Sequence, residues 1–305
     1  MDMQTRPEHQ ADAVAPTVSI GMPAYNAQAT IRESIDALLR QTLVDFELII
    51  SDNASTDGTW AIIEDCARRD TRIVAMRQPV NVGANGNYSA VFRAARARYF
   101  KWASSNDWCA PEFLALCVAH LEAHPDTVMV SPRTRLFETS LDSAIDYDRD
   151  AAFDSENAVD RLFELGRSLA LNNVLNGVIR SDALRTTRLV EHYPGADVVL
   201  VGHLALLGKV SLLEPHLFYR RMDQATATRL MSREAVHRHH YPAKTWRSLF
   251  PAWRMTAGWL QAVLSSHLSA RETRRALGWV LRHAYWSKSD LRRDLVDAIN
   301  YPVRR

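Results

Sequence analysis

Short apolar segments alternate with amphipathic segments along the first 130 residues, and this alternation constrains the fold more than any other feature of the chain. Val18, Ile20 and Met22 alternate with small residues before a proline, which predicts a strand that ends in a turn. The apolar run at 46–50 is typical of a strand covered on both faces of a parallel sheet. Strands and helices in alternation predict an α/β fold whose mainly parallel, Rossmann-like sheet is flanked by helices. Further strands are expected at 72–76, 99–103, 128–130, 177–180 and 210–213, and further helices at 59–68, 87–97 and 198–207.

The segment after the first strand carries the signature of a helix start. Thr30 and Glu33 have the spacing of a capping box, in which each side chain bonds to the other residue's backbone N–H. Ile31, Ile35 and Leu38 then recur along one helical face. The pattern predicts a helix that packs on the sheet through that face.

Composition places the chain among globular proteins. It has 305 residues, of which 47% are hydrophobic, enough for one large core or a core with a helical appendage. Cys66, Cys109 and Cys117 are odd in number and lack metal-ligand spacing, which predicts buried, reduced thiols. The polar N-terminus has no apolar core of a signal peptide, and no apolar run is long enough to span a bilayer. We therefore expect a cytoplasmic protein.

Charge and tryptophan are concentrated near the C-terminus. Residues 244–305 contain 12 Lys and Arg against 4 Asp and Glu, whereas the whole chain has a net charge of only +2. We expect a flexible tail at 1–16, a catalytic domain at 17–225 and a helical, basic, Trp-rich region at 226–305. Its helices are expected to pack within the molecule, to form a homo-oligomer, or to lie peripherally on the inner face of an anionic membrane.

An acidic segment interrupts the alternation. Seven Asp and Glu residues fall between positions 138 and 156, with little that could pack in a core. This composition is consistent with a mobile loop beside an acceptor site or with a solvated insertion.

Polar motifs follow several of the predicted strands. They read PAYNA at 23–27, SDNASTDGT at 51–59, NVGANGN at 81–87 and KWASSND at 101–107. Ligands of open α/β sheets bind at the carboxyl ends of the strands, where these motifs fall. Asp52 directly follows a buried strand, where its carboxylate can accept from a base N–H or a ribose hydroxyl, although an Asx-turn or a helix cap also suits it. The motifs together predict a nucleotide site.

The four motifs, in this order and spacing, resemble those of the family 2 glycosyltransferases, an inverting group with the GT-A fold. The resemblance covers residues 17–221 and is strongest in the first half. It implies an enzyme that moves a sugar from a nucleoside diphosphate, UDP by expectation, to a hydroxyl of a carbohydrate or lipid-linked glycan. It also implies a set of nucleotide contacts: Pro23, Tyr25, Asn26, Asp52, Asn85 and Asn106.

The chain departs from the family pattern at its metal motif. Relatives place two or three aspartates where this chain has Ser105, Asn106 and Asp107, so Asp107 alone could hold a divalent cation. Mn²⁺ or Mg²⁺ bound by one carboxylate together with the donor phosphates is our expectation. Cationic side chains in place of the metal, a catalytically inactive site, and Asp107 as the cap of a helix near Pro111 are the alternatives.

The second half of the chain carries the remaining catalytic candidates. By the same resemblance, YPGADVVLVGHLALLGKV identifies Asp197 as the base that deprotonates the acceptor, although an acid in the first turn of a helix also stabilises that helix. Arg220 and Arg221 match the arginines that approach the diphosphate, or else belong to a packed surface strand. The histidine that often follows is replaced by Met222 and Asp223.

Other classes of protein fit less well. A nucleotide-sugar binding partner in glycan assembly, with weakened or no catalysis, is the alternative to an active transferase. A nicotinamide dehydrogenase would need a G-x-G-x-x-G motif after the first strand, which the chain lacks. No nucleic-acid recognition module accompanies the basic region.

Overall fold

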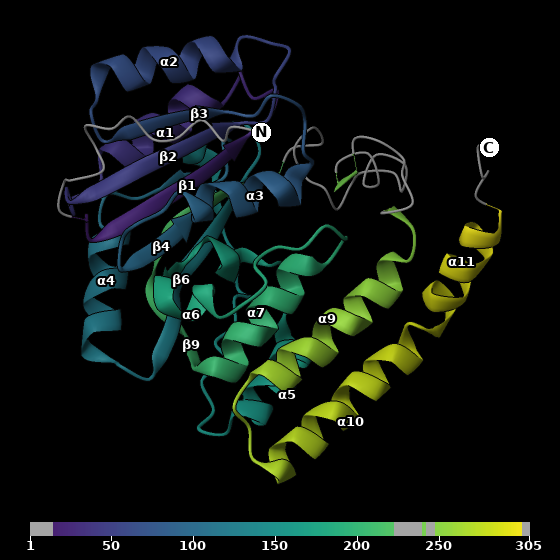
Figure 1. Ribbon diagram of the computed structural model, residues 1–305. Helices are drawn as coiled ribbons and strands as arrows, with labels where there is room; N and C mark the ends of the chain where they lie inside the picture. The colour runs from purple at the N-terminus through teal and green to yellow at the C-terminus, as the bar shows by residue number, and fades with distance from the viewer. Residues whose placement is uncertain (1–14, 223–239, 242–247, 301–305) are drawn as a thin grey trace.

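A nine-stranded sheet forms the centre of the molecule in this computed structural model, which describes residues 15–222, 240–241 and 248–300 (Figure 1). Helices cover both faces of the sheet. The strands are β1 (Val18–Ala24), β2 (Phe46–Asp52), β3 (Ile73–Arg77), β4 (Tyr99–Trp102), β5 (Trp108–Cys109), β6 (Thr127–Phe137), β7 (Ile145–Asp146), β8 (Val178–Arg180) and β9 (Lys209–Arg221). The main helices are α1 (Ile31–Leu39), α2 (Thr59–Arg69), α3 (Ala84–Arg93), α4 (Phe113–Ala123), α5 (Ala158–Ser168), α6 (Ser181–Arg185), α7 (Ala196–Leu207), α9 (Pro251–Ser265), α10 (Ala270–Trp286) and α11 (Lys288–Ile299).

The strand order brings the polar motifs to one edge of the sheet. β3, β2, β1 and β4 are adjacent and parallel, so their carboxyl ends meet. β6 and β9 are also parallel to each other, whereas β8, β5 and β7 pair antiparallel with their neighbours. The predicted, mainly parallel sheet is confirmed. The register sets Ala24 at the end of β1 opposite Asp52 at the end of β2.

Alternate side chains of the inner strands fill two hydrophobic clusters, one on each face of the sheet. In β2, Leu48 and Ile50 belong to one cluster and Ile49 to the other, and all three are fully buried. Burying each such side chain contributes about 1.5–3 kcal/mol. Buried aliphatic residues on both faces explain why this strand reads as continuously apolar.

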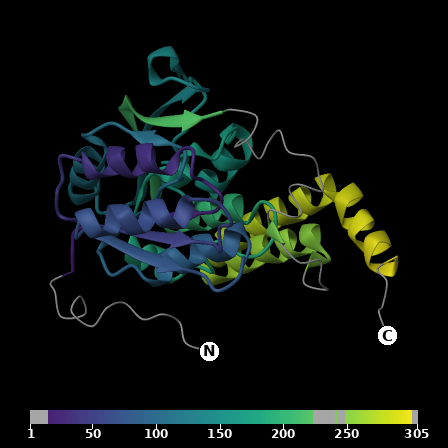
Figure 2. The ribbon, with the colours of Figure 1, turned by 90° about the horizontal axis from the view of Figure 1, so that it is seen from above.

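The last three described helices form an outer layer at one side of the sheet, with α11 farthest from it (Figure 2). α9 packs on α7, and α10 packs on α9 and α5. The rings of Trp259 and Trp279 meet edge to face with centroids 4.8 Å apart. A Cβ atom at Gly202 of α7 would lie 2.2 Å from the Trp259 ring, so a glycine is required at this contact. α9 and α10 thus share a hydrophobic core with the sheet.

The predicted capping box at the start of α1 is wrong. Thr30 makes no side-chain cap, because its hydroxyl donates to the carbonyl of Ser105 at 2.9 Å. Glu33 instead pairs with Arg221 at 3.1 Å. Both side chains are used for tertiary contacts with the 104–107 segment and β9.

Helix α3 starts earlier than its predicted limits of 87–97. Gly83 precedes it with a φ of 78°, a left-handed conformation that glycine adopts without strain. Asn85 therefore lies inside the helix, in its first turn. The helix ends at Arg93, and the backbone N–H of Ala97 then donates to the hydroxyl of Ser19 at 3.1 Å.

The acidic 138–156 segment is packed at two points, contrary to the expectation that little in it could pack. Phe153 is fully buried and pairs with Val210, while Asp150 accepts from the backbone N–H of Thr134 at 2.6 Å. β7, which belongs to this segment, pairs with β6.

Other expectations concern the cysteines, the membrane and the chain ends. All three cysteines are buried free thiols, as predicted. No helix within the described ranges is both long and apolar enough to cross a bilayer. Most of the expected 1–16 tail lies outside the described residues, as do Asp223, Trp246 and most of 226–247.

Candidate active site

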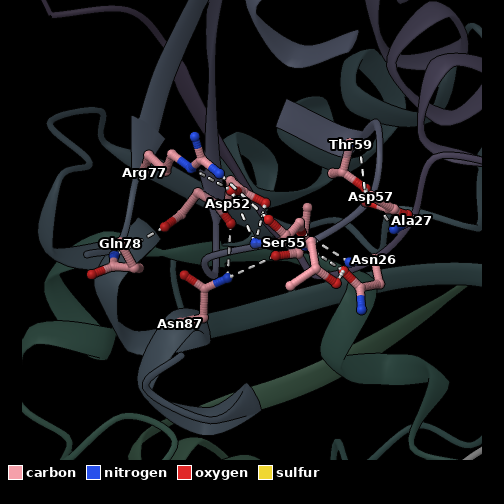
Figure 3. Close-up of polar contacts among 12 residues, drawn as sticks. Asn26, Ala27, Asp52, Ser55, Asp57, Thr59, Arg77, Gln78 and Asn87 are labelled. Atoms are coloured by element: carbon pink, nitrogen blue, oxygen red, sulfur yellow. Dashed lines mark hydrogen bonds and ion pairs between the residues drawn. The ribbon is translucent and has the colours of Figure 1, made fainter. Parts of the chain in front are cut away.

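The loops after β1 and β2 are joined by Asn26. Its backbone N–H donates to the Ser55 hydroxyl at 2.9 Å, and its side-chain oxygen accepts from the N–H of Thr56 at 2.9 Å (Figure 3). Its φ of 47° is left-handed, a conformation that asparagine adopts more readily than most residues. Tyr25 is exposed and Pro23 is partly buried. Tyr25 thus offers a free aromatic face beside the end of β1, whereas Asn26 shapes both loops.

Asp52 is a fully buried carboxylate at the end of β2 with a cationic partner. Its oxygens accept from the Ser55 N–H at 3.2 and 3.3 Å, and one forms an ion pair with Nε of Arg77 at 3.2 Å (Figure 3). Arg77 ends β3 directly opposite Asp52 in the register, and its guanidinium lies 5.3 Å from the Trp60 ring centroid. The bond to Ser55 spans three residues, one more than an Asx-turn, and Asp52 does not cap α2, whose N-cap is Gly58. The ion pair adds a cation to this end of the site.

Helix α3 joins the ends of the central strands to the segment before α7. The Asn87 amide donates to the carbonyl of Ser51 at 2.8 Å. Two residues earlier, the Asn85 amide donates to the carbonyls of Glu191 and Tyr193 at 2.5 and 3.0 Å. The Asn85 side chain, predicted as a nucleotide contact, therefore holds the segment that leads into α7.

The loop that carries Asp107 is fixed by Arg221. The Arg221 backbone N–H donates to the Asp107 carboxylate at 2.9 Å, and its Nε donates to the Asn106 carbonyl at 3.2 Å. Its guanidinium pairs with Glu33 and lies 4.7 Å from the Phe137 ring centroid. Arg221 thus joins α1, β6 and the Asp107 loop. Capping of α4 by Asp107 is excluded, because its N-cap is residue 112.

Asp107 itself is partly buried. Burial raises the pKa of its carboxyl, while the hydrogen bond from the Arg221 backbone and the charge of Arg220 act in the opposite direction. Within the described ranges, no three His, Cys, Asp or Glu side chains are grouped to hold a metal. The residues present therefore fit a cation that the donor phosphates bind together with Asp107, and do not fit a cage built by protein alone.

Two consecutive asparagines hold the other two catalytic candidates. The Asn172 amide donates to the Asp197 carboxylate at 2.9 Å, and Nη1 of Arg220 donates to the side-chain oxygen of Asn173 at 2.7 Å. Asp197 lies in the first turn of α7, after Gly195 with a φ of 84°. The positions of the acid and the arginine are thereby coupled through one short segment of backbone.

Helix α3 also contacts the ends of two strands of the sheet. The Asn87 amide binds the end of β2, and the Tyr88 carbonyl accepts from Nε1 of Trp102 at the end of β4 at 3.0 Å. Burial raises the pKa of the Tyr88 phenol and a hydrogen bond with Ser104 lowers it, while the charges of Asp107 and Asp197 raise it and that of Arg220 lowers it. Helix α3 thus connects the Asp52 end of the sheet to the end of the strand that precedes Asp107.

Three polar residues of this site were not predicted from the sequence. Arg77 directly follows the predicted third strand, and that position beside the second strand was the available signal. Asn172 and Asn173 precede a predicted strand as a pair of asparagines in LNNVLNG. Their partners are distant in the chain, so the contacts become visible only in the fold.

Comparisons with known sequences identify the family of the chain. A family model described as Glycosyl transferase family 2 matches residues 19–175, just over half of the chain. An uncharacterized glycosyltransferase of Bacillus subtilis, EpsJ, is 40% identical over 93 residues, which are 30% of this chain and 27% of that protein. The Escherichia coli UDP-Glc:alpha-D-GlcNAc-diphosphoundecaprenol beta-1,3-glucosyltransferase WfaP is 36% identical over 91 residues, 30% of this chain and 36% of that protein. The matched segments thus span well under half of either relative.

Solved structures show the same architecture. TarS 1-349 of S. aureus in complex with UDP-GlcNAc superposes with a TM-score of 0.63 and 15% identity, over 94% of this chain and 76% of that one. Mannosyltransferase PcManGT from Pyrobaculum calidifontis, in complex with GDP-Man and Mn²⁺, gives a TM-score of 0.54 and 14% identity, over 98% of this chain and 89% of that one. The fold is GT-A, as expected. With the family model matched over just over half of the chain, including Asp52 and Asp107, the chain belongs to the family 2 glycosyltransferases.

Proposed function

We propose that this glycosyltransferase moves a sugar, with inversion, from a UDP-linked donor to a hydroxyl of a carbohydrate or lipid-linked glycan. The observation that carries the proposal is a series of hydrogen bonds that links the candidates: Asn172 binds Asp197, the adjacent Asn173 binds Arg220, and the backbone N–H of the next residue, Arg221, binds Asp107. The names of similar proteins support the donor and acceptor classes, because TarS is solved with UDP-GlcNAc and WfaP is named for transfer to a diphosphoundecaprenol-linked sugar.

The Asp52 end of the site suits the nucleoside. A buried carboxylate can accept hydrogen bonds from a base N–H and from ribose hydroxyls. Arg77 keeps this carboxylate paired, and the exposed ring of Tyr25 provides a surface on which a base can stack. Pro23 lies in β1, and the backbone N–H of Asn26 fixes the loop that follows by its bond to Ser55.

The Asp107 end suits the diphosphate. Arg220 supplies a guanidinium in a fixed orientation, and arginine matches phosphate geometry with two parallel donors. A Mn²⁺ or Mg²⁺ ion held by Asp107 and the phosphates would add positive charge at the leaving group. Arg221 acts mainly through the loop that it holds, since its guanidinium is committed to Glu33 and to the Glu138 carbonyl.

The reaction follows from Asp197. Its carboxylate takes the proton of the acceptor hydroxyl as that oxygen attacks the anomeric carbon from the face opposite the diphosphate. The bond from the anomeric carbon to the diphosphate oxygen breaks, and its electron pair leaves with the nucleotide. Asn172 orients the base, leaving one carboxylate oxygen for the acceptor.

The experiment is a donor screen with purified protein, candidate acceptors and Mn²⁺, read out as release of nucleoside diphosphate. Asp197→Asn should lower turnover by at least a hundredfold, in line with the usual contribution of a general base. Asp182→Asn is the matched control, because Asp182 also lies in the first turn of a helix but is exposed. Equal turnover in wild type and Asp197→Asn would remove Asp197 as the base.

A second candidate function is a nucleotide-sugar binding partner without turnover. It is favoured by Ser105 and Asn106, which leave Asp107 as the only acid of the motif. Calorimetric titration with UDP-sugars distinguishes the two functions. Binding without turnover at any Mn²⁺ or Mg²⁺ concentration would support the partner, whereas turnover abolished by EDTA and restored by Mn²⁺ would exclude it.

A further inference from the structure

Exposed apolar side chains gather on the last three helices. Of the fourteen large apolar side chains exposed in the described part of the chain, nine belong to α9, α10 and α11. Single exposed apolar residues are common on proteins, but a concentration of them marks an interaction surface. Helices α10 and α11 lie at the edge of the molecule (Figure 2), whereas the first turn of α9 contacts the segment before α7, where Arg254 donates to the His192 carbonyl at 3.3 Å.

Helix α10 presents the most regular part of this surface. Five exposed residues recur at intervals of three and four and so share one helical face, here called the α10 stripe: Arg271, Arg274, Gly278, Leu281 and Tyr285. Leu281 is 72% exposed and Tyr285 64% exposed. Lys288 extends the stripe, since its ammonium lies 4.2 Å from the Tyr285 ring centroid. A shallow groove lined by Leu268, Leu277 and Leu281 runs alongside.

Among the described residues, Arg271, Arg274 and Lys288 form no ion pair with a carboxylate. The ion pairs of α10 and α11 instead join Arg275 to Asp160 and Arg293 to Asp290. Glu272 is the only acid of α10, and it is turned toward the helix start, where it accepts from Ser269 and from the Asn157 amide. Arg275, on a neighbouring face, is paired with Asp160 at 2.6 Å. Arg274, which lines the groove together with Leu281, and Arg271 one turn before it therefore present uncompensated charge on the stripe.

This combination identifies the chemistry of the occupant. Apolar and aromatic side chains flanked by unpaired cations fit the boundary between anionic headgroups and acyl chains. A second copy fits poorly, because a symmetric contact of the stripe with itself would bring two sets of unpaired arginines into one interface. We propose that the α10 stripe docks the protein on an anionic phospholipid surface, with Leu281 and Tyr285 inserted and Arg271, Arg274 and Lys288 on lipid phosphates.

The test is vesicle flotation of the full chain. Vesicles of phosphatidylcholine with a quarter phosphatidylglycerol are compared with pure phosphatidylcholine, at low and high salt. Wild type should float only with the anionic vesicles, and less at high salt. Leu281→Asp and the double variant Arg271→Glu/Arg274→Glu should each lower the vesicle partition coefficient at least tenfold. All altered side chains are exposed, so circular dichroism should show an unchanged fold.

Matched controls separate the stripe from net charge and from general hydrophobicity. Leu116→Asp replaces an exposed leucine on α4, and Arg93→Glu/Arg185→Glu makes the same change in net charge elsewhere. Both should float like wild type. Absence of flotation with anionic vesicles, or equal losses in the controls, would overturn the proposal. A dimer would also overturn it, if sedimentation shows that the wild-type protein is dimeric and that Leu281→Asp dissociates the dimer, and if the protein does not bind vesicles. The outcome does not depend on whether the chain transfers sugar.

Discussion

The side-chain amide of Asn172 donates to the carboxylate of Asp197 at 2.9 Å, across 25 residues of chain. The neighbouring Asn173 accepts from Arg220 at 2.7 Å and donates to Asp150 at 2.9 Å. The Asn172–Asn173 dipeptide thereby sets the orientation of Asp197, the proposed base, relative to Arg220, which is proposed to bind the diphosphate. It also connects both to the acidic segment, since Asp150 belongs to the 138–156 region.

Removal of the Asn172 amide should impair turnover more than donor binding. Hydrogen bonds to charged groups contribute about 1.5–3 kcal/mol, so Asn172→Ala should lower kcat by about 10- to 100-fold with an unchanged donor KM. Steady-state kinetics with the donor identified by the screen checks this. Asn176→Ala is the control, because the Asn176 amide makes only a 3.5 Å bond to the Asn173 carbonyl. A raised KM with normal kcat would assign Asn172 to donor binding instead.

The two glycines of the helical layer should respond in opposite directions to alanine. A Cβ at Gly202 would meet the Trp259 ring at 2.2 Å, so Gly202→Ala should destabilise by about 1–3 kcal/mol through overpacking. Gly278 lies in α10 with open space around it, so Gly278→Ala should stabilise by about 0.5–1 kcal/mol through helix propensity. Urea unfolding measures both. Equal effects of the two substitutions would mean that Trp259 does not pack against α7 as described.

Arg77 should matter for the nucleotide. Arg77→Gln leaves the buried Asp52 carboxylate without its ion pair, and we expect weaker UDP binding by about tenfold together with a loss of stability of about 1–3 kcal/mol. Arg68→Gln, at an exposed pair with Asp65, should change stability by less than about 1 kcal/mol. Calorimetry with UDP provides the measurement. An unchanged UDP affinity would place the nucleoside away from Asp52.

The sequence predicted most of what depends on local pattern. Val18–Met22 and the 46–50 run lie in parallel strands because their apolar residues fill the clusters above and below the sheet. Asp52 and Asp107 follow strands that both run parallel to β1, so they lie at the same edge of the sheet.

Residues that depend on tertiary contacts were misjudged or missed. Thr30 and Glu33 have the spacing of a capping box, but the Thr30 hydroxyl binds the Ser105 carbonyl and the Glu33 carboxylate pairs with Arg221 instead. Phe153 was overlooked because a single aromatic in an acidic stretch gives no periodic signal. The roles of Asn172 and Asn173 depend on α7 and β9, which follow later in the chain, so local pattern contained no information about them.

The buried His203 makes stability depend on pH. Burial lowers its pKa to about 4, and its Nε2 lies 3.2 Å from the Ser265 hydroxyl. The unfolded chain, with an ordinary histidine pKa, binds more protons than the folded protein between about pH 6.5 and 4. Stability should therefore fall as the pH falls through this range, by about 2 kcal/mol between pH 7 and 5. His203→Gln should flatten this slope in urea unfolding, and the exposed His267→Gln should not. Identical slopes would place His203 in contact with water.

The stereochemistry of transfer tests the central claim most directly. Proton NMR of the product formed from an α-linked UDP-sugar reports the anomeric configuration of the new bond. If Asp197 deprotonates an acceptor that attacks opposite the diphosphate, the product is β-linked, and Asp197→Asn binds UDP as wild type does but forms almost none of it. An α-linked product, or a β-linked product formed at the wild-type rate by Asp197→Asn, would contradict the account.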